Sequence, residues 1–424
     1  MAKYDTYVDS QTPYIGEIPS HWKMVQNKRV MHKEKRLCES YNGQNIISLT
    51  LNGAIVRDLG AGGKMPASFD GYQYVYPGEL LMCLFDIDVT PRCVGRVNNE
   101  GLTSPAYSSF VLHDNANLGY YYYYYLMLDY TKELLHLSKN LRHSLTEEQL
   151  GQIKVPLPPI YEQKAISEYL DKKITVIDSI IEEARSSIEE YKAWKASIIY
   201  ETITKGLNAK IEMKDSGVEW IGKIPSHWEL VRIKNIAEFM PKCDFSFCSN
   251  KTAITFTPME CIRTGSFENR SKLYGEIEGS YTQYAEGDIV LAKVTPCFEN
   301  GNVCIMKQLH AGVGMGSSEL FVLRPKKILD RFLLYFLQHS GFKDAACSTM
   351  SGTGGLKRVS SLFLQNCYVP YPNLQEQEEI ANYLDEKCRD ISSLIEEKEL
   401  LVADLESYKK SLIFEVVTGK RKVV

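Results

Sequence analysis

The chain has 424 residues, of which 44% are hydrophobic, 24% charged and 11% aromatic, and its 49 basic and 53 acidic side chains give a net charge of −4. This ordinary composition excludes collagen-like, disordered and disulfide-scaffold classes. At roughly 100–200 residues per domain, the length predicts two to four domains. Irregularly spaced cysteines, no apolar signal-peptide core at the start and no run of ~18 apolar residues predict a cytoplasmic protein without a membrane span or a metal site.

Residues 1–158 predict a first globular part. Short β-branched and aromatic runs alternate there with Gly, Pro and Asn, which is typical of an α+β domain with many loops. Residues 120–125 are consecutive tyrosines. The corresponding later segment, residues 331–336, has the apolar spacing of a helix, so we expect the tyrosines to pack in a core rather than to form a stacking platform.

Residues 159–210 predict a long central helix. From residue 160 to residue 205 no Gly or Pro occurs, and apolar residues recur at spacings of three and four over several heptads. The predicted interface positions are Leu170, Ile177, Ile181 and Ile188. Lys195 falls in the same register and interrupts it, and Gly206 is the predicted C-cap.

The second half of the chain repeats the first. Residues 14–22, Tyr-Ile-Gly-Glu-Ile-Pro-Ser-His-Trp, return as Trp-Ile-Gly-Lys-Ile-Pro-Ser-His-Trp at residues 220–228, an offset of 206. Val-Pro-Leu-Pro and Glu-Gln at residues 155–163 are answered by Val-Pro-Tyr-Pro and Glu-Gln at residues 369–377, an offset of 214. Collinear matches at slowly growing offsets indicate a tandem duplication. His21 and His227 are repeat equivalents beside tryptophans, and we expect them to pack or cap.

The repeat divides the chain into globular parts at 1–158 and 211–372 and helical parts at 159–210 and 373–424. The second helix has its predicted interface at Leu384, Ile391, Ile395 and Leu405, with Lys409 as an interruption. Because the chain returns through a whole globular part, we expect the helices to pack antiparallel. The predicted fold class is α+β, with two globular domains, an antiparallel coiled coil and a pseudo-two-fold internal repeat.

The acidic excess lies on the helices. The globular parts together carry 33 basic and 32 acidic residues, whereas the helical parts carry 16 and 21. The negative net charge therefore does not exclude a basic face on a globular part. No phosphate-binding loop, glycine-rich cofactor turn, methyltransferase motif or nuclease constellation is visible, so the sequence predicts no catalytic residue.

This alternation of globular part and repeated helix resembles the specificity (S) subunit of Type I restriction-modification systems. The matching features are the two Ile-Gly-x-Ile-Pro-Ser-His-Trp openings, the two Pro-x-Pro…Glu-Gln…Ile…Tyr-Leu-Asp helix starts, residues 293–301 (Lys-Val-Thr-Pro-Cys-Phe-Glu-Asn-Gly) and the glycine-rich residues 352–358. The resemblance covers essentially the whole chain. In the first copy residues 138–144, Ser-Lys-Asn-Leu-Arg-His-Ser, depart from the glycine-rich pattern, so the loop contacts of that copy are less transferable.

The resemblance implies a non-catalytic protein that binds double-stranded DNA. Each globular part would be a target-recognition domain reading one half of a bipartite asymmetric site, and the helices would hold both at a fixed separation. It also implies two methyltransferase subunits and further restriction–translocase subunits as partners. S-adenosylmethionine, ATP and Mg²⁺ would be bound by those partners, so no cofactor is expected on this chain.

Within this resemblance, polar and basic loop residues are the candidate DNA contacts, and an ordinary loop is the alternative for each. Asn can pair with adenine, and Lys can reach guanine or phosphate. Glycines with neighbouring cations suit phosphate contact, and we expect this for Lys357 and Arg358. The candidates in the second globular part are Lys293, Thr295, Phe298, Asn300, Gly354, Gly355, Lys357 and Arg358. Those in the first are Arg92, Arg96, Lys139, Arg142 and His143.

Two other classes of function remain as alternatives. A complete methyltransferase or nuclease would require a cofactor or metal motif, and the sequence shows none. A coiled-coil scaffold without nucleic-acid binding explains the helices but leaves the duplicated, loop-rich parts without a role.

Overall fold

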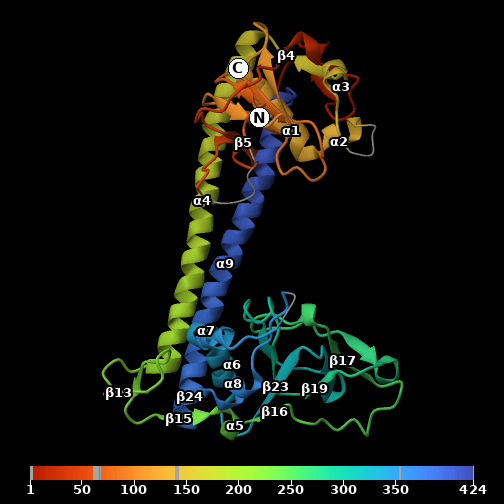
Figure 1. Ribbon diagram of the computed structural model, residues 1–424. Coiled ribbons are helices and arrows are strands. Elements are labelled where there is room, and N and C mark those ends of the chain that lie inside the picture. The colour runs from red at the N-terminus through yellow and green to blue at the C-terminus, as the bar shows by residue number, and fades with distance from the viewer. Residues whose placement is uncertain (1–2, 61–65, 67, 139–142, 353–354, 424) are drawn as a thin grey trace. The chain divides into compact units, whose positions relative to one another are not determined.

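The computed structural model describes residues 3–60, 66, 68–138, 143–352 and 355–423. The chain forms two compact units: unit 1 comprises Met1–Arg185 and Glu399–Val424, and unit 2 comprises Ser186–Lys398 (Figure 1). Each unit contains one globular part and one half of each long helix. The two long helices are α4 (Ile160–Lys205) and α9 (Leu374–Val417).

The globular part of unit 1 mixes short strands with three helices. Its strands are β1 (Tyr7–Asp9), β2 (Glu17–Pro19), β3 (Lys23–Gln26), β4 (Met31–Glu34), β5 (Ile47–Thr50), β6 (Gly53–Val56), β7 (Gln73–Val75), β8 (Leu80–Cys83), β9 (Val94–Arg96), β10 (Gly101–Thr103), β11 (Tyr107–Leu112) and β12 (Lys154–Leu157). Its helices are η1 (Asn27–Arg29), α1 (Leu118–Thr131), α2 (Glu133–Leu137) and α3 (Glu147–Gln152), of which η1 is a 3-10 turn.

A four-stranded antiparallel sheet in the order β4-β11-β8-β9 is the centre of this part. All four residues of β8 are buried because apolar groups cover both faces. Leu80 and Met82 point into the main core with α1, whereas Leu81 packs with Ile47 and Val75 on the other face. This alternation follows the two-residue period of a strand.

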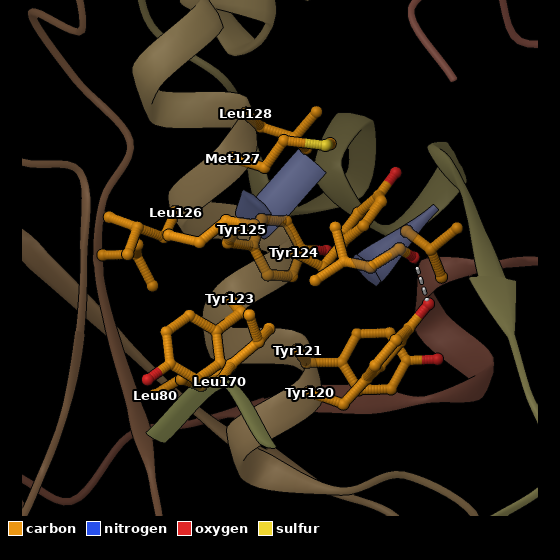
Figure 2. Packing of buried hydrophobic residues seen from close by; sticks show 14 of the residues in the cluster. Leu80, Tyr120, Tyr121, Tyr123, Tyr124, Tyr125, Leu126, Met127, Leu128 and Leu170 are labelled. Atoms are coloured by element: carbon orange, nitrogen blue, oxygen red, sulfur yellow. Dashed lines mark hydrogen bonds between the residues drawn. The ribbon is translucent and has the colours of Figure 1, made fainter. Parts of the chain in front are cut away.

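The tyrosine run forms the buried helix α1, which confirms the expectation of core packing (Figure 2). Tyr120, Tyr121, Tyr124 and Tyr125 are each 0% exposed. A helix that is apolar all round must be buried on every side, and the core supplies those sides. The hydroxyl of Tyr121 donates to the Pro156 carbonyl at 2.9 Å, so the buried tyrosine keeps its polar end paired.

The long helices pack antiparallel within unit 1. Leu170, Ile177 and Ile181 of α4 are buried in one core with Leu412 and Ile413 of α9, against which Leu405 also packs. The predicted interruption, Lys409, forms an ion pair with Asp178, and Arg185 pairs with Glu406 at 2.7 Å. The residue further along α4, Arg185, pairs with the residue that comes earlier on α9, Glu406, so the two helices run in opposite directions.

Unit 2 repeats this architecture with additions. Its strands are β13 (Met213–Asp215), β14 (Lys223–Pro225), β15 (Glu229–Arg232), β16 (Ala237–Phe239), β17 (Ala253–Thr257), β18 (Ser271–Leu273), β19 (Thr282–Ala285), β20 (Ile289–Ala292), β21 (Val303–Ile305), β22 (Val313–Gly316), β23 (Leu320–Pro325) and β24 (Tyr368–Tyr371). Its shorter helices are α5 (Ile233–Ile236), α6 (Asp330–Gln338), α7 (Ser340–Ser348) and α8 (Ser361–Asn366), with 3-10 turns η2 (Met259–Cys261), η3 (Tyr274–Glu276) and η4 (His310–Gly312).

The shared scaffold and the differing insertions can be separated strand by strand. The sheet β16-β23-β20-β21 of unit 2 has the order of β4-β11-β8-β9, and the β13-β14 and β15-β24 pairs correspond to β1-β2 and β3-β12. Unit 2 adds a four-stranded sheet, β18-β17-β22-β19, where unit 1 has the two-stranded pairs β5-β6 and β7-β10. One scaffold therefore carries two different sets of inserted strands and loops.

Both helix halves of unit 2 contribute buried side chains to that unit. Leu384 and Ile391 of α9 are 0% and 2% exposed and Ile188 of α4 is 6% exposed, while Ile395 is half-buried. Lys195, the other predicted interruption, donates from Nζ to Ser392 Oγ at 2.7 Å. The lysines within the heptads are thus accommodated by polar partners on the facing helix.

A glutamate anchors the start of each long helix. In unit 1, Glu162 accepts hydrogen bonds from the Trp22 indole at 2.9 Å and the Tyr4 hydroxyl at 3.0 Å, and His21 Nε2 lies 2.6 Å from its other oxygen. In unit 2, Glu376 takes the same position beside Trp228 and His227. His21 and His227 therefore help to attach the helices to the globular parts, as expected.

The stability of unit 1 should depend on the ionisation of Glu162. Burial alone would raise its pKa, but hydrogen bonds from Trp22, His21 and Tyr4 outweigh that effect and hold the pKa below the ordinary value of 4.5. A lowered folded-state pKa gives stability that is complete above 4.5 and is lost as the pH falls through the folded-state value. We expect the unfolding free energy of unit 1 to fall below pH 4.5 by less in Glu162→Gln than in the wild type, as measured by urea unfolding at successive pH values. Identical pH profiles would contradict this role.

The end of α9 fastens onto the beginning of the chain within unit 1. The Tyr7 hydroxyl donates to the Gly419 carbonyl at 3.1 Å, and the Tyr120 hydroxyl donates to the Val417 carbonyl at 2.9 Å. Gly419 has a φ of +72°, and a Cβ there would lie 2.3 Å from Pro19. In unit 2, Gly206 ends α4 with a φ of +71° beside Trp228, which confirms the predicted C-cap. Each helix therefore ends against the tryptophan of the repeated opening motif.

Candidate functional site

Three loop segments of unit 2 meet where β20 ends and β23 begins. Ala292 pairs with Leu320 in the sheet, so Lys293 lies beside Glu319, whose carbonyl accepts the Lys293 amide at 3.1 Å. The third segment joins through the Thr295 amide, which donates to the Lys357 carbonyl at 3.0 Å. Residues 293–300, 317–319 and 355–358 are called the unit 2 loop site below.

Arg358 is held by this framework on two sides. Its amide donates to the Ser351 carbonyl at 2.8 Å, and its carbonyl accepts the Ser351 amide at 3.1 Å. The next residue, Val359, donates to the Lys293 carbonyl at 2.9 Å. Arg358 is also bridged to Val294 as in an antiparallel sheet. The backbone of Arg358 is therefore fixed by hydrogen bonds, although the residue belongs to a loop.

In the unit 2 loop site, two cationic side chains, Arg358 and Lys293, lie beside one carboxylate, that of Glu319. Arg358 donates from Nε and Nη2 to the two oxygens of Glu319 at 2.8 and 2.7 Å. Lys293 donates to the Ser318 carbonyl at 2.7 Å, with Nζ 3.9 Å from Glu319. The hydrogen bonds from Arg358 lower the pKa of Glu319, and they raise that of Arg358. Glu319 is thus ionised and offsets part of the positive charge.

Lys357 differs from its neighbour Arg358. Its side chain is exposed, and among the described residues it has no ion pair or side-chain hydrogen bond. Asn300 is also exposed, at the end of the turn that follows β20. Gly355 has a φ of +82° and open space where a Cβ would stand. These three residues remain available to a ligand, whereas Gly354 lies outside the described residues.

Two predicted contacts of this segment have internal roles. Phe298 is 1% exposed and packs in the core of unit 2 near Phe342, so it cannot meet a base, which corrects the expectation for this residue. The turn aims the aromatic ring inward because this apolar surface gains most from burial. Thr295 Oγ1 donates to the Gly355 carbonyl at 3.1 Å and accepts the Lys357 amide at 3.0 Å. Thr295 therefore joins two segments of the site.

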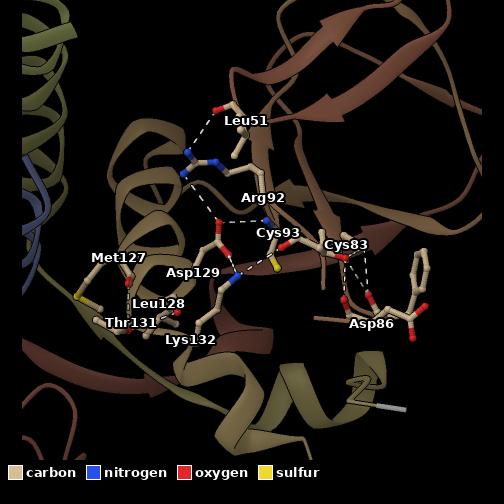
Figure 3. Close-up of polar contacts among 12 residues, drawn as sticks. Leu51, Cys83, Asp86, Arg92, Cys93, Met127, Leu128, Asp129, Thr131 and Lys132 are labelled. Carbon is tan, nitrogen blue, oxygen red and sulfur yellow. Dashed lines mark hydrogen bonds and ion pairs between the residues drawn. The ribbon is translucent and has the colours of Figure 1, made fainter. Parts of the chain in front are cut away.

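The predicted arginines of unit 1 are bound within the fold. Arg92 is 3.8 Å from Asp129, donates to the Leu51 carbonyl at 3.2 Å and has a side chain that is 13% exposed (Figure 3). Arg96 donates to both oxygens of Asp171 on α4, at 2.6 and 3.3 Å, and lies 4.3 Å from the Tyr122 ring. Asp129 is a buried carboxylate that requires such a partner, and Arg96 is held by both Asp171 and an aromatic ring. Both arginines therefore serve the packing of unit 1, which corrects their proposed role as DNA contacts.

The other candidates of unit 1 follow α2. His143 Nδ1 lies 3.0 Å from Asp88. Lys139 and Arg142 lie outside the described residues. Each of the three candidates that the structure describes, Arg92, Arg96 and His143, has a carboxylate partner within unit 1.

The sequence analysis missed a basic segment in unit 1 and an acidic residue in unit 2. Lys28, Arg29 and Lys35 are exposed and form no ion pair among the described residues. Their signal was the dense run of cations at residues 28–36. Glu319 gave no local signal, because only the pairing of β20 with β23 places it beside Lys293.

Within the described ranges, no group of three or more His, Cys, Asp or Glu side chains could hold a metal ion. Nor does any helix in that part of the chain have the length and apolar character needed to cross a membrane.

Comparison with known families now identifies the class of protein. The model of the family described as Type I restriction modification DNA specificity domain matches residues 93–190 and 225–401, which together exceed half of the chain. The chain therefore belongs to this family. The two matched regions fall in the two copies of the repeat.

Individual relatives agree with this assignment. The Type I restriction enzyme EcoAI specificity subunit of Escherichia coli is 40% identical over 163 residues, which are 37% of this chain and 27% of the relative. The MjaVIII specificity subunit of Methanocaldococcus jannaschii is 29% identical over 285 residues, covering 64% and 63%. The match thus spans about a quarter of the E. coli relative.

Solved structures share the fold. A chain from a study of complex assembly and conformational transition of the type I R-M system has a TM-score of 0.69 at 14% identity, covering 94% of this chain and 98% of that chain. The HsdS subunit from Thermoanaerobacter tengcongensis has a TM-score of 0.51 at 15% identity, covering 95% and 98%. At these identities the likeness is one of fold.

Proposed function

We propose that this chain is the sequence-specific DNA-binding subunit of a Type I restriction-modification complex and has no catalytic role of its own. Each unit reads one half of a bipartite, asymmetric site in double-stranded DNA. The observation that carries the proposal is the combination of one repeated scaffold with two different sets of inserted strands and loops. Such a chain can present two different reading surfaces on equivalent supports.

The proposal assigns the remaining activities to partners. Two methyltransferase subunits dock on equivalent surfaces of the repeated scaffold, since a repeated surface suits two copies of one partner. Restriction–translocase subunits join that assembly. S-adenosylmethionine is bound by the methyltransferase, and ATP and Mg²⁺ by the translocase. The family assignment and the repeated helix anchors at Glu162 and Glu376 support this division.

An exchange of recognition domains tests the proposal. Replacing residues 1–158 with the equivalent part of a relative that has another target should change one half of the methylated site and preserve the other, because the inserts of each unit are separate. The measurement is methylome sequencing of a host that expresses the chimera with its methyltransferase. The reciprocal exchange of residues 211–372 is the control and should change the other half. Changes in both halves after each exchange would contradict independent reading.

A coiled-coil scaffold without nucleic-acid binding is the competing function. It predicts no sequence preference when this chain and its methyltransferase are titrated with DNA over a range of salt concentrations. The proposed function instead predicts binding that weakens with salt and keeps a preference for one sequence.

A further inference from the structure

Because Arg358 pairs with Glu319, it differs from its neighbour Lys357, although the sequence alone suggests the same phosphate contact for both. A cation that contacts phosphate contributes mainly its charge, and an exposed side chain without an ion-pair partner serves this purpose. Lys357 meets that description. Arg358 does not, because Glu319 already balances its charge through two hydrogen bonds. While the pair persists, a phosphate approaching Arg358 also meets the repulsion of the nearby Glu319 carboxylate.

Among the described residues, the geometry of the pair leaves one edge of the guanidinium without a hydrogen-bond partner. Nε and one hydrogen of Nη2 are directed at Glu319. One hydrogen of Nη1 and the second hydrogen of Nη2 then point in parallel and form an end-on fork. An arginine fork fits O6 and N7 of guanine in the major groove, and this bidentate contact distinguishes guanine from other bases. The free edge of Arg358 therefore has the donor pattern of a guanine reader.

The surroundings hold this fork in place. The Arg358 side chain is 47% exposed, so the free edge can meet a ligand, while Glu319 is 29% exposed. Glu319 follows Ser317 and Ser318 directly after β22 and precedes β23, and the backbone of Arg358 is hydrogen-bonded on two sides. A side chain that is oriented before binding loses little conformational freedom when it binds. This arrangement favours directional recognition over general charge attraction.

We propose that Arg358, oriented by Glu319, reads a guanine in the half-site of unit 2, and that Lys357 contacts the DNA backbone. The inference rests on the proposed function and assigns a specificity-determining role within it. Glu319 acts as a positioning residue, because it touches Arg358 and not the base. Exposed Asn300 lies in the same loop site and is left free for a neighbouring base pair.

The test compares variants of the two neighbouring residues in the full chain bound to its methyltransferase. DNA duplexes carry the cognate site and each single base-pair change in the unit 2 half-site, and affinities are measured over a range of salt concentrations. Arg358→Ala should lose about 5- to 150-fold of the discrimination at one guanine and keep it elsewhere. Its salt slope should stay near that of the wild type, since Arg358 adds no unbalanced charge and Glu319 keeps Lys293 as an ion-pair partner in the variant.

Lys357→Ala is the matched control. It should weaken binding to all duplexes alike and lower the salt slope by about one unit, with discrimination unchanged. Arg358→Lys should fail to restore the guanine preference because an ammonium group lacks the planar fork. Glu319→Gln should weaken the preference at the same guanine and increase the salt slope, since it leaves Arg358 with an unbalanced charge.

The possible results distinguish a failure of the guanine-reading role from a failure of the proposed DNA-binding function. If Arg358→Ala lowers the salt slope and leaves every base preference intact, Arg358 is a phosphate contact and the inference is wrong. If Arg358→Ala changes nothing, Arg358 lies outside the interface. If Glu319→Gln behaves as the wild type, the positioning role is wrong. If the unmodified complex prefers no sequence, the proposed function fails before the inference is reached.

Discussion

Truncation after Ser411 should unfold unit 1. The deletion removes four aliphatic side chains that are each 0% exposed: Leu412, Ile413, Val416 and Val417. Burying such a side chain contributes about 1.5–3 kcal/mol, so the loss is about 6–12 kcal/mol. That loss is comparable with the whole stability of a domain, about 5–15 kcal/mol. Hydrogen exchange should show loss of protection in β8 and β11 and retained protection in β20 and β23 of unit 2.

A shorter truncation provides the control. Removing the chain after Gly419 leaves all four aliphatic side chains in place. It deletes the Lys420 contact with the Glu17 carbonyl, the Arg421–Glu415 ion pair and the Lys422 contact with the Tyr4 ring. These partly exposed contacts contribute about 1–3 kcal/mol together. Equal exchange in both truncated chains would show that the end of α9 is not part of the core of unit 1.

Glu162→Ala should destabilise its unit far more than Glu376→Ala, although the two residues are repeat equivalents. The Glu162 side chain is 4% exposed, and its loss leaves the Trp22 indole and the Tyr4 hydroxyl buried without their acceptor. A buried polar group without a partner costs about 1–3 kcal/mol, so we expect about 2–6 kcal/mol for the two groups together. The Glu376 side chain is 28% exposed, and its tryptophan contact is longer, at 3.4 Å.

The comparison is made by urea unfolding of the two full-length variants, with hydrogen exchange to assign each transition to a unit. We expect about 1 kcal/mol for Glu376→Ala, because water can replace the carboxylate. Glu162→Gln is a useful intermediate, since the amide oxygen can still accept one of the hydrogen bonds. Similar losses for both alanine variants would mean that burial does not distinguish the two anchors.

Periodic patterns made the scaffold predictable from the sequence. The heptads predicted both long helices because helix and interface depend on spacings of three and four residues within one segment. The tyrosine run was placed in the core by comparison with its repeat equivalent, residues 331–336, and α1 confirms this. For the scaffold elements that both copies share, each copy could be checked against the other.

The candidate site was less predictable because it depends on pairing between distant segments. Arg96 and Asp171 are 75 residues apart and meet only because β9 and α4 pack in the same unit. Glu319 reaches Lys293 through the alignment of β20 with β23. Phe298 was placed at the surface from its position in a loop, but the turn directs it into the core. The sequence identifies a basic residue, but it does not reveal which distant carboxylate will form an ion pair with it.

The discontinuity of unit 1 reverses the usual order of folding during protein synthesis. Domains generally form as they leave the ribosome, beginning with the N-terminal one. Here the last residue of unit 2, Lys398, emerges before Glu399–Val424, which unit 1 needs to cover Ile177 and Ile181. The nascent N-terminal unit therefore keeps part of its apolar surface exposed until Glu399–Val424 has been synthesised. The N-terminal part of unit 1 is synthesised first, but its apolar surface stays exposed for the longest time. We therefore expect it to depend most on chaperones during synthesis.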